Sequence, residues 1–363
     1  MANTTTDQQI YSRREYFTDI TQRINQTQRG SRVLVASMGI RPDEPEVVVI
    51  IEALAKAAQR GAIVSLLVDA YDYLIDDRKG QLGSLWRRKA LPAKPRPNEQ
   101  AHLDMLAYLR KAGVICVVTN MPSHAFSNPF AGRSHIKTTV VDDYLYIGGC
   151  NLHEVNQLDL MIGWHDRNAA DWLYNKMQQI VQQPFTKKVL GKADQQYNIS
   201  PSSTLILDSG AKRQSRIMDT ALQVIDNAQE WVVLTTQFLP DRSAKHLAAA
   251  LKRGVKVYSI FNNYHQFKGV NYVAQQSIKQ IAKMHRPHSL FAYELPADLP
   301  FLHAKVLATE KEFMLGSHNY LQIGVNFGTA ELSLHQKDPL VSKRVAQAII
   351  AQCSLGTQIS LPG

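Results

Sequence analysis

Long hydrophobic runs are absent from this sequence of 363 residues. The apolar stretch from Val47 to Ile51 is far too short to span a bilayer, which requires about 20 apolar residues. The first residues, MANTTTDQQIYSRREYF, contain no apolar segment after their first basic residues. We therefore expect neither a signal peptide nor a membrane-spanning anchor.

Cysteine is also scarce, and the sequence contains only Cys116, Cys150 and Cys353. Their number is odd, and their spacing matches neither a metal-ligand set nor a disulfide framework. A secreted fold held together by disulfides is therefore excluded. We expect a protein of the reducing cytoplasm.

Acidic residues are outnumbered, because 31 Asp and Glu stand against 41 Lys and Arg, for a formal net charge of +10. A positive surface attracts polyanions, either nucleic acid phosphates or anionic lipid headgroups. Charge alone does not choose between these partners, and many of the basic residues would in any case serve to solvate exposed faces. With 45% hydrophobic residues, the chain has enough apolar side chains for a large core and enough length for two domain-sized units.

The most informative feature that is present is an internal repeat. A buried strand closed by Pro-Asp is expected at residues 32–37 and again at 230–236. Each is followed by an Ala- and Leu-rich helix that ends in Arg-Gly, and then by a β-branched strand at 63–68 or 255–260. The glycine suits a helix C-cap. This order predicts an α/β fold of two related halves, each with a mostly parallel sheet flanked by helices.

The two halves, expected at 1–190 and 200–363 with a boundary in the polar stretch 182–203, differ in length. The distance from the Arg of Arg-Gly to the histidine described next is 75 positions in the first half and 50 in the second. The candidate insertion, residues 78–98, contains seven Lys or Arg, no acidic residue, three prolines and Trp86. We interpret it as an exposed basic loop, which either grips an anionic surface or has no role beyond solvation.

Each half also contains a His-x-Lys sequence, with an acid after four further residues and an asparagine 16 positions after the histidine. Residues i and i+2 of a strand point to the same face, so each His and its Lys should project together from a strand. The residues that share this pattern are His135, Lys137 and Asn151 in the first half, and His303, Lys305 and Asn319 in the second.

These residue types meet the needs of phosphodiester cleavage. The reaction requires a nucleophile, a proton donor for the leaving alkoxide, and cations around the phosphoryl oxygens. One unprotonated histidine can attack phosphorus while a protonated one donates to the leaving oxygen, and the lysines and asparagines can hold the other oxygens. A single His-x-Lys carries little weight, but two matched copies in matched repeats favour catalysis. The other histidines and the cysteines form no complete zinc set.

The doubled HxKxxxxD/E pattern, with Gly-Gly or Gly-Ser shortly before each asparagine, resembles the phospholipase D superfamily. The resemblance extends from about Arg32 to about Leu334. It implies two halves about a pseudo-twofold axis, one active site at their junction, a phosphohistidine intermediate, and no requirement for a metal or another cofactor. The glycine and serine positions that match the motif are Gly148, Gly149, Gly316 and Ser317.

The resemblance also assigns roles to four acidic residues. It implies that Asp142 and Glu310 support the loop after each motif strand, and that Asp159 and Glu331 orient the imidazoles, fixing the tautomer and stabilising the imidazolium. Glu310 replaces the usual Asp. An acid at this position also argues against the tyrosyl-DNA phosphodiesterase branch, whose motif has none there. By analogy with the family, we assign the nucleophile to the first-half histidine and the general acid to the second-half one.

Within the superfamily, Gly-Gly-x-Asn in the first half and Thr-Thr-Gln-Phe in the second resemble the bacterial cardiolipin synthase and phosphatidylserine synthase-like group. We therefore expect phosphatidyl transfer or hydrolysis on a phospholipid substrate, by a cytoplasmic protein that associates peripherally with anionic membrane and has no obligate protein partner. The alternative is a metal-independent nuclease, whose partner would be nucleic acid. An inactive scaffold is disfavoured, because both motifs are complete.

The basic insertion supplies a hypothesis about the membrane. It combines seven cationic residues with Trp86 and the leucines at 82, 85 and 91. Lys and Arg are attracted to an anionic bilayer, and Trp is favoured at headgroup depth. We expect this loop to dock the enzyme on anionic phospholipid, whereas a nuclease would have less need of the leucines.

Overall fold

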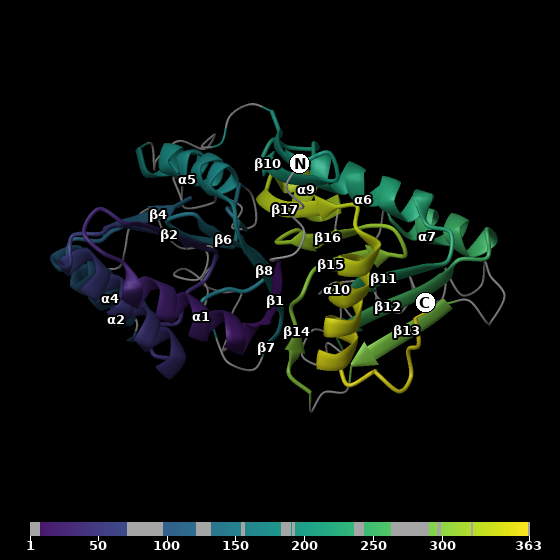
Figure 1. The fold of residues 1–363 in the computed structure, drawn as a ribbon, viewed down its shortest axis with the longest axis horizontal. Coiled ribbons are helices and arrows are strands. Elements are labelled where there is room, and N and C mark those ends of the chain that lie inside the picture. The colour runs from purple at the N-terminus through teal and green to yellow at the C-terminus, as the bar shows by residue number, and fades with distance from the viewer. Residues whose placement is uncertain are drawn as a thin grey trace.

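The computed structural model describes residues 8–70, 97–120, 132–153, 157–182, 190, 193–235, 243–262, 290–295, 299–320 and 322–361. They form two halves side by side, the first in purple to teal and the second in green to yellow (Figure 1). This confirms the expected α/β class with two related halves. The domain limits 1–190 and 200–363 stay a prediction.

The first half is built on a seven-stranded sheet of order β1-β8-β6-β5-β2-β3-β4. Helix α2 ends at Gln59 with Arg60 as its C-cap, and Gly61 follows with a positive φ of 93°, a conformation that glycine adopts readily. The glycine thus terminates the helix as expected, one residue beyond the C-cap itself. The elements are β1 (Gln9–Ser12), α1 (Arg13–Gln26), β2 (Arg32–Ser37), α2 (Pro45–Gln59), β3 (Ile63–Asp69), α4 (Pro97–Lys111), β4 (Ile115–Thr119), β5 (Thr138–Val141), β6 (Tyr144–Gly148), β7 (Gln157–Leu158), β8 (Leu160–His165) and α5 (Arg167–Gln182).

The second half contains an eight-stranded sheet of order β13-β12-β11-β15-β16-β17-β10-β9. Its β11, α7 and β12 repeat the β2, α2 and β3 of the first half. The elements are β9 (Gln195–Ser200), β10 (Ser203–Ser209), α6 (Arg216–Asn227), β11 (Trp231–Thr235), α7 (Ser243–Lys252), β12 (Lys256–Asn262), β13 (Leu290–Leu295), β14 (Phe301–Leu302), β15 (Val306–Thr309), β16 (Phe313–Gly316), α9 (Gln322–Phe327), β17 (Ala330–Gln336) and α10 (Pro339–Gln352).

The expectation of mostly parallel sheets is wrong, because both sheets are mixed. Only β2-β3-β4 and β11-β12-β13 run parallel, and the other neighbouring strands of the two sheets pair antiparallel. The reason lies in the connections. Parallel neighbours need a long crossover such as α2, whereas β5 and β6 are separated by only Asp142 and Asp143, and so short a turn joins antiparallel strands.

Helices cover the outer face of each sheet, and the inner faces share one core. Apolar residues of α1, α2 and α4 pack on the first sheet, and those of α6 and α7 pack on the second. A third, larger core joins side chains of both sheets to α5 and α10. The two halves are therefore joined by a common apolar layer, and the candidate site lies where this layer meets the polar ends of the strands.

The basic insertion at 78–98 lies outside the described residues, apart from Pro97 and Asn98 at the start of α4. Its expected role in membrane docking stays a prediction. In the part of the chain that the structure describes, no helix is long and apolar enough to cross a membrane.

Candidate active site

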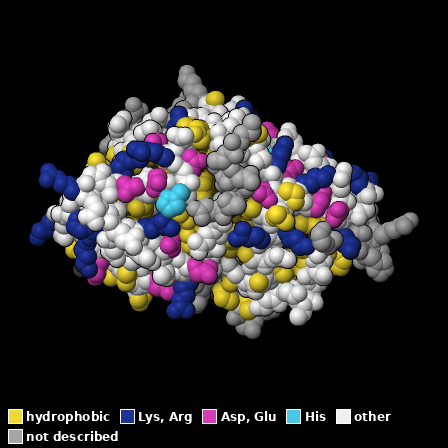
Figure 2. Space-filling view, viewed as in Figure 1, with side chains coloured by type: hydrophobic (Ala, Val, Ile, Leu, Met, Phe, Trp, Pro, Cys, Tyr) yellow, Lys and Arg dark blue, Asp and Glu magenta, His cyan; other side chains and the backbone are white. Residues whose placement is uncertain are grey.

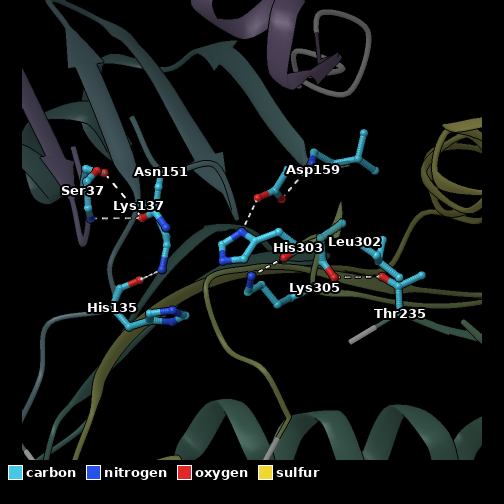
Figure 3. A network of polar contacts seen from close by, with 12 residues as sticks. Ser37, His135, Lys137, Asn151, Asp159, Thr235, Leu302, His303 and Lys305 are labelled. Atoms are coloured by element: carbon cyan, nitrogen blue, oxygen red, sulfur yellow. Dashed lines mark hydrogen bonds and ion pairs between the residues drawn. The ribbon is translucent and has the colours of Figure 1, made fainter. Parts of the chain in front are cut away.

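The two His-x-Lys sequences meet at the junction between the halves. The ring centroids of His135 and His303 are 6.5 Å apart, and both side chains are almost fully buried. Figure 3 shows Lys137 beside His135 and Lys305 beside His303. The structure thus brings the two motifs into one centre.

The i and i+2 argument placed each His-x-Lys within a strand, and this prediction is wrong. Each His-x-Lys is an extended segment that ends where β5 or β15 begins. The intervening residues, Ile136 and Ala304, are nevertheless buried in the shared core as expected. The strand prediction fails because the backbone here bonds to the opposite half instead of continuing the ladder of its own sheet.

Each histidine is bound by a carboxylate from the other half. His135 Nδ1 is 3.0 Å from Glu331 Oε2, and His303 Nδ1 is 2.6 Å from Asp159 Oδ2. The carboxylate on Nδ1 leaves Nε2 of each ring as the nitrogen available for reaction. The repeated motif singled out the two histidines and the family resemblance the two carboxylates, but neither indicated the exchange of partners.

The backbone register explains this exchange. In the segment ahead of His303, β14 pairs in parallel with β7, and His303 N donates to Leu158 O at 2.8 Å, one residue before Asp159. In the other half, His135 N donates to Ala330 O at 2.9 Å, one residue before Glu331. Each histidine is therefore fixed beside the carboxylate that follows its backbone partner.

The carboxylates remain ionised despite complete burial. Burial alone would raise the pKa of Glu331, but the charge of His135 and its hydrogen bond outweigh this effect and lower the pKa to about 2. Ser317 Oγ also donates to Glu331. The pKa of Asp159 is lowered in the same way, by His303, against the opposing effect of burial.

Burial has the opposite effect on the bases of the centre. It lowers the pKa of His135 to about 4 and that of His303 to about 3, and the neighbouring lysine charges add to the shift. Burial also lowers the pKa of Lys305 to about 8, and that of Lys137 well below its usual value, with Lys305 as the second cause. An anion bound between the lysines would offset the cost of burying their charge and so favour their protonated forms.

The glycines and asparagines of the motifs lie against this network. Asn151 Oδ1 accepts long hydrogen bonds from Ser37 Oγ at 3.5 Å and Gly39 N at 3.4 Å (Figure 3). A Cβ on Gly149 would lie 2.2 Å from Asp159 Oδ1, so this position must be glycine where Asp159 approaches. Asn319 lies three residues beyond Gly316, in the segment after β16.

A side chain at Gly148 or Gly316 would collide with the neighbouring strand. The added Cβ would lie 2.2 Å from Leu160 O in the first half and 2.3 Å from Leu332 O in the second. The close approach brings the end of β6 against β8, which follows Asp159, and the end of β16 against β17, which contains Glu331.

Asp142 and Glu310 directly follow β5 and β15, where each bonds the start of the neighbouring strand, β2 or β11. Asp142 accepts from Arg32 N at 2.8 Å, and Glu310 accepts from the amides of Gln229, Glu230 and Trp231. The longer Glu side chain reaches three consecutive amides. Both contacts fix the strand that pairs with the motif strand, which is the geometry that a supporting role requires.

Sequence reasoning missed two residues that hold the segments ahead of the histidines. At the end of β3, Asp69 accepts from Ser134 N at 2.8 Å and pairs with Arg133 at 2.9 Å. At the end of β12, Asn262 bonds both the N–H and the C=O of Leu302. A polar residue ending the second strand of each repeat was the signal that could have revealed them.

Among the described residues, no group of three or more His, Cys, Asp or Glu side chains could hold a metal ion.

The sequence matches the model of the family described as cardiolipin synthase, phospholipase D-like domain, over residues 20–181 and 221–352. The chain belongs to this phospholipase D family. Members of the superfamily are phosphatidyltransferases and phosphodiesterases, and this chain is an enzyme of that kind. A search of curated protein sequences finds no match.

Two solved structures share the fold of this phospholipase D family member. Phosphatidylserine synthase of Haemophilus influenzae Rd KW20 has a TM-score of 0.69 at 14% identity, covering 96% of this chain and 87% of the synthase. Polyphosphate kinase of Porphyromonas gingivalis has a TM-score of 0.59 at 14% identity, covering 97% of this chain but only 51% of the kinase. At such identities the likeness concerns the fold alone.

Proposed function

We propose that the protein transfers or hydrolyses the phosphodiester of a phospholipid through a phosphohistidine intermediate. The observation that carries this proposal is the pair of facing histidines, 6.5 Å apart, each with its Nδ1 held by a carboxylate. With each Nδ1 bonded to a carboxylate, both Nε2 atoms are left for reaction, and rings 6.5 Å apart are close enough to share one phosphoryl group. The two lysines of the centre favour an anionic group there.

In the first step, His135 Nε2 forms a bond to phosphorus while the P–O bond to the leaving alcohol breaks. His303 gives its proton to the leaving oxygen. In the second step, an acceptor hydroxyl returns a proton to His303, its oxygen bonds to phosphorus, and the N–P bond breaks. An alcohol as acceptor makes the enzyme a synthase, and water makes it a hydrolase.

The family model supports lipid as the substrate, since its description names cardiolipin synthase. Lys and Arg side chains lie on both halves of the face drawn in Figure 2, interspersed with Asp and Glu. A positive net charge suits anionic lipid and DNA alike. The substrate test is therefore to incubate the pure protein with phosphatidylglycerol vesicles and, separately, with single- and double-stranded DNA, and to identify the products. Turnover of DNA without turnover of lipid would contradict the proposal.

Single replacement of either histidine tests the shared centre. We expect His135→Ala and His303→Ala each to abolish turnover, because neither half supplies both nucleophile and acid. When the protein is quenched during turnover, an acid-labile N–P bond should join histidine to the phosphoryl ester that remains after the alcohol leaves, and His135→Ala should remove this adduct. The matched control is His165→Ala, a half-exposed histidine outside the centre. Substantial activity in either single variant would reject the mechanism.

The basic insertion supplies a test of membrane docking. Replacing Trp86, Arg87, Arg88 and Lys89 with Ser should reduce both vesicle binding and lipid turnover, because these side chains combine charge with an aromatic ring. Cleavage of a small soluble phosphodiester should not fall. Unchanged vesicle binding, or a loss of DNA binding in its place, would favour the nuclease alternative.

A further inference from the structure

Two arginines and a histidine that the proposed chemistry does not use lie together beyond the end of β2. Arg41 Nε donates to His153 Nε2 at 3.0 Å, and an amino group of Arg13 donates to the carbonyl oxygen of His153. All three side chains are buried, and Arg41 is only 1% exposed. Lys137 and Lys305 are buried to the same degree.

The positive charge of this cluster is incompletely balanced. Arg13 pairs with Glu46 at 3.2 Å, whereas Arg41 forms no ion pair with a carboxylate in the described part of the chain. Its Nη2 has no hydrogen-bond acceptor there, and neither has Nε of Arg13. A guanidinium remains charged at any physiological pH, and burying it with an unpaired N–H is costly. Such groups call for a ligand or a functional explanation.

The cluster adjoins the reaction centre through short, direct connections. Arg41 N donates to Leu152 O at 2.7 Å, and Leu152 N donates to Ser37 Oγ at 3.1 Å. Ser37 in turn contacts Asn151. On the other side, the charge of Arg13 interacts with Asp159, which holds His303. An anion bound by the cluster would therefore lie beside a phosphoryl group at the histidines.

We propose that Arg41, with Arg13 and His153, forms a second anion subsite that binds a phosphate other than the one being transferred. This proposal rests on the proposed function and deepens it, because it selects substrates that bring two phosphates to the enzyme. The fork of a guanidinium suits the paired oxygens of a phosphate. The second phosphate has two possible sources: the headgroup of an acceptor phospholipid, or a donor that is a diphosphate diester.

Arg41→Gln tests the subsite by changing substrate preference. In the acceptor arm, phosphatidylglycerol and glycerol compete as acceptors for one donor, and kcat/KM is measured for each. In the donor arm, a diphosphate diester lipid is compared with phosphatidylglycerol as donor. We expect the preference for the substrate with the second phosphate to fall about tenfold or more in one arm, which identifies the source. The matched control is Arg216→Gln, an exposed arginine on α6 that bonds Gln196.

A purely structural role for Arg41 predicts a different result. The rates with both acceptors and both donors would then fall by the same factor, and an unchanged preference in both arms overturns the proposal. If Arg41→Gln does not fold, as judged by circular dichroism, Arg41→Lys keeps the charge without the fork and should still lower the preference. A wild-type enzyme without any preference for a second phosphate overturns the proposal without a variant.

Failure of the proposed function gives a distinguishable result. A wild-type protein that turns over no phosphodiester would refute the reaction but not the subsite. Titration calorimetry with inorganic phosphate then tests the subsite directly. Two equivalents should bind to the wild type and one to Arg41→Gln. A single equivalent in both would overturn the subsite.

Discussion

At the scale of single residues, the two histidines are buried bases that stay neutral in the free protein near pH 7. Burial lowers the pKa of His135 to about 4 and that of His303 to about 3, yet the proposed reaction needs one of them protonated. An anionic phosphate between Lys137 and Lys305 would offset the lysine charges that contribute to both shifts. Substrate binding should therefore help to protonate the general acid.

The lowered pKa values predict how stability depends on pH. In the unfolded chain a histidine takes up its proton near pH 6.5, whereas His135 in the folded chain does so only near pH 4. Between these values the unfolded state binds more protons, so the free energy of unfolding should decrease as the pH falls, by about 1.4 kcal/mol per pH unit for each such histidine. The stabilisation is complete above pH 6.5.

Urea unfolding at pH 7, 6 and 5 measures this slope. His135→Gln, which cannot be protonated in this range, should make the slope shallower, and His165→Gln is the matched substitution outside the centre. A slope that His135→Gln leaves unchanged would show that burial of this imidazole does not govern the acid sensitivity.

At the scale of elements, the position after β6 differs from its counterpart after β16. Gly149 leaves room for Asp159, while Ser317 at the matching position donates to Glu331. Gly149→Ala would place a Cβ 2.2 Å from Asp159 Oδ1 and displace the carboxylate from His303. We expect kcat to fall by about 100-fold, as for a misplacement of about 1 Å. Ser317→Ala adds no atom and should cost less; equal losses in kcat would contradict this steric account.

The sequence predicted strands and helices correctly where the signal was local. The strands at 32–37 and 63–68, the helix between them and the Gly61 turn that terminates it follow from apolar patterning and glycine, and the structure contains them. The antiparallel strands and the extended His-x-Lys segments were not predicted, because they depend on pairing between distant parts of the chain. The buried ion pair of Asp69 and Arg133 also joins residues 64 positions apart.

At the scale of the whole molecule, duplication produces one centre and not two. The residues of the centre could be selected from the sequence because both copies carry the same spacing. Which carboxylate bonds which histidine could not be predicted, because the packing of the halves sets the register of β7 with β14 and of Ser134 with Ala330. The exchange of carboxylates between the halves is thus a property of the assembled molecule.

This exchange can be tested by nuclear magnetic resonance on the full chain with ¹⁵N-labelled histidine. Glu331 lies in the second half, yet Glu331→Gln should alter the ring-nitrogen signals of His135, because the carboxylate fixes the proton on Nδ1. Asp159 lies in the first half, and Asp159→Asn should likewise alter the ring-nitrogen signals of His303 in the second half. The two histidines are assigned by the signals that His135→Ala and His303→Ala remove. The crossed pattern is expected because each histidine backbone bonds to the residue just before the opposite carboxylate. If each carboxylate variant instead altered the histidine of its own half, the halves would pack in solution with a different register.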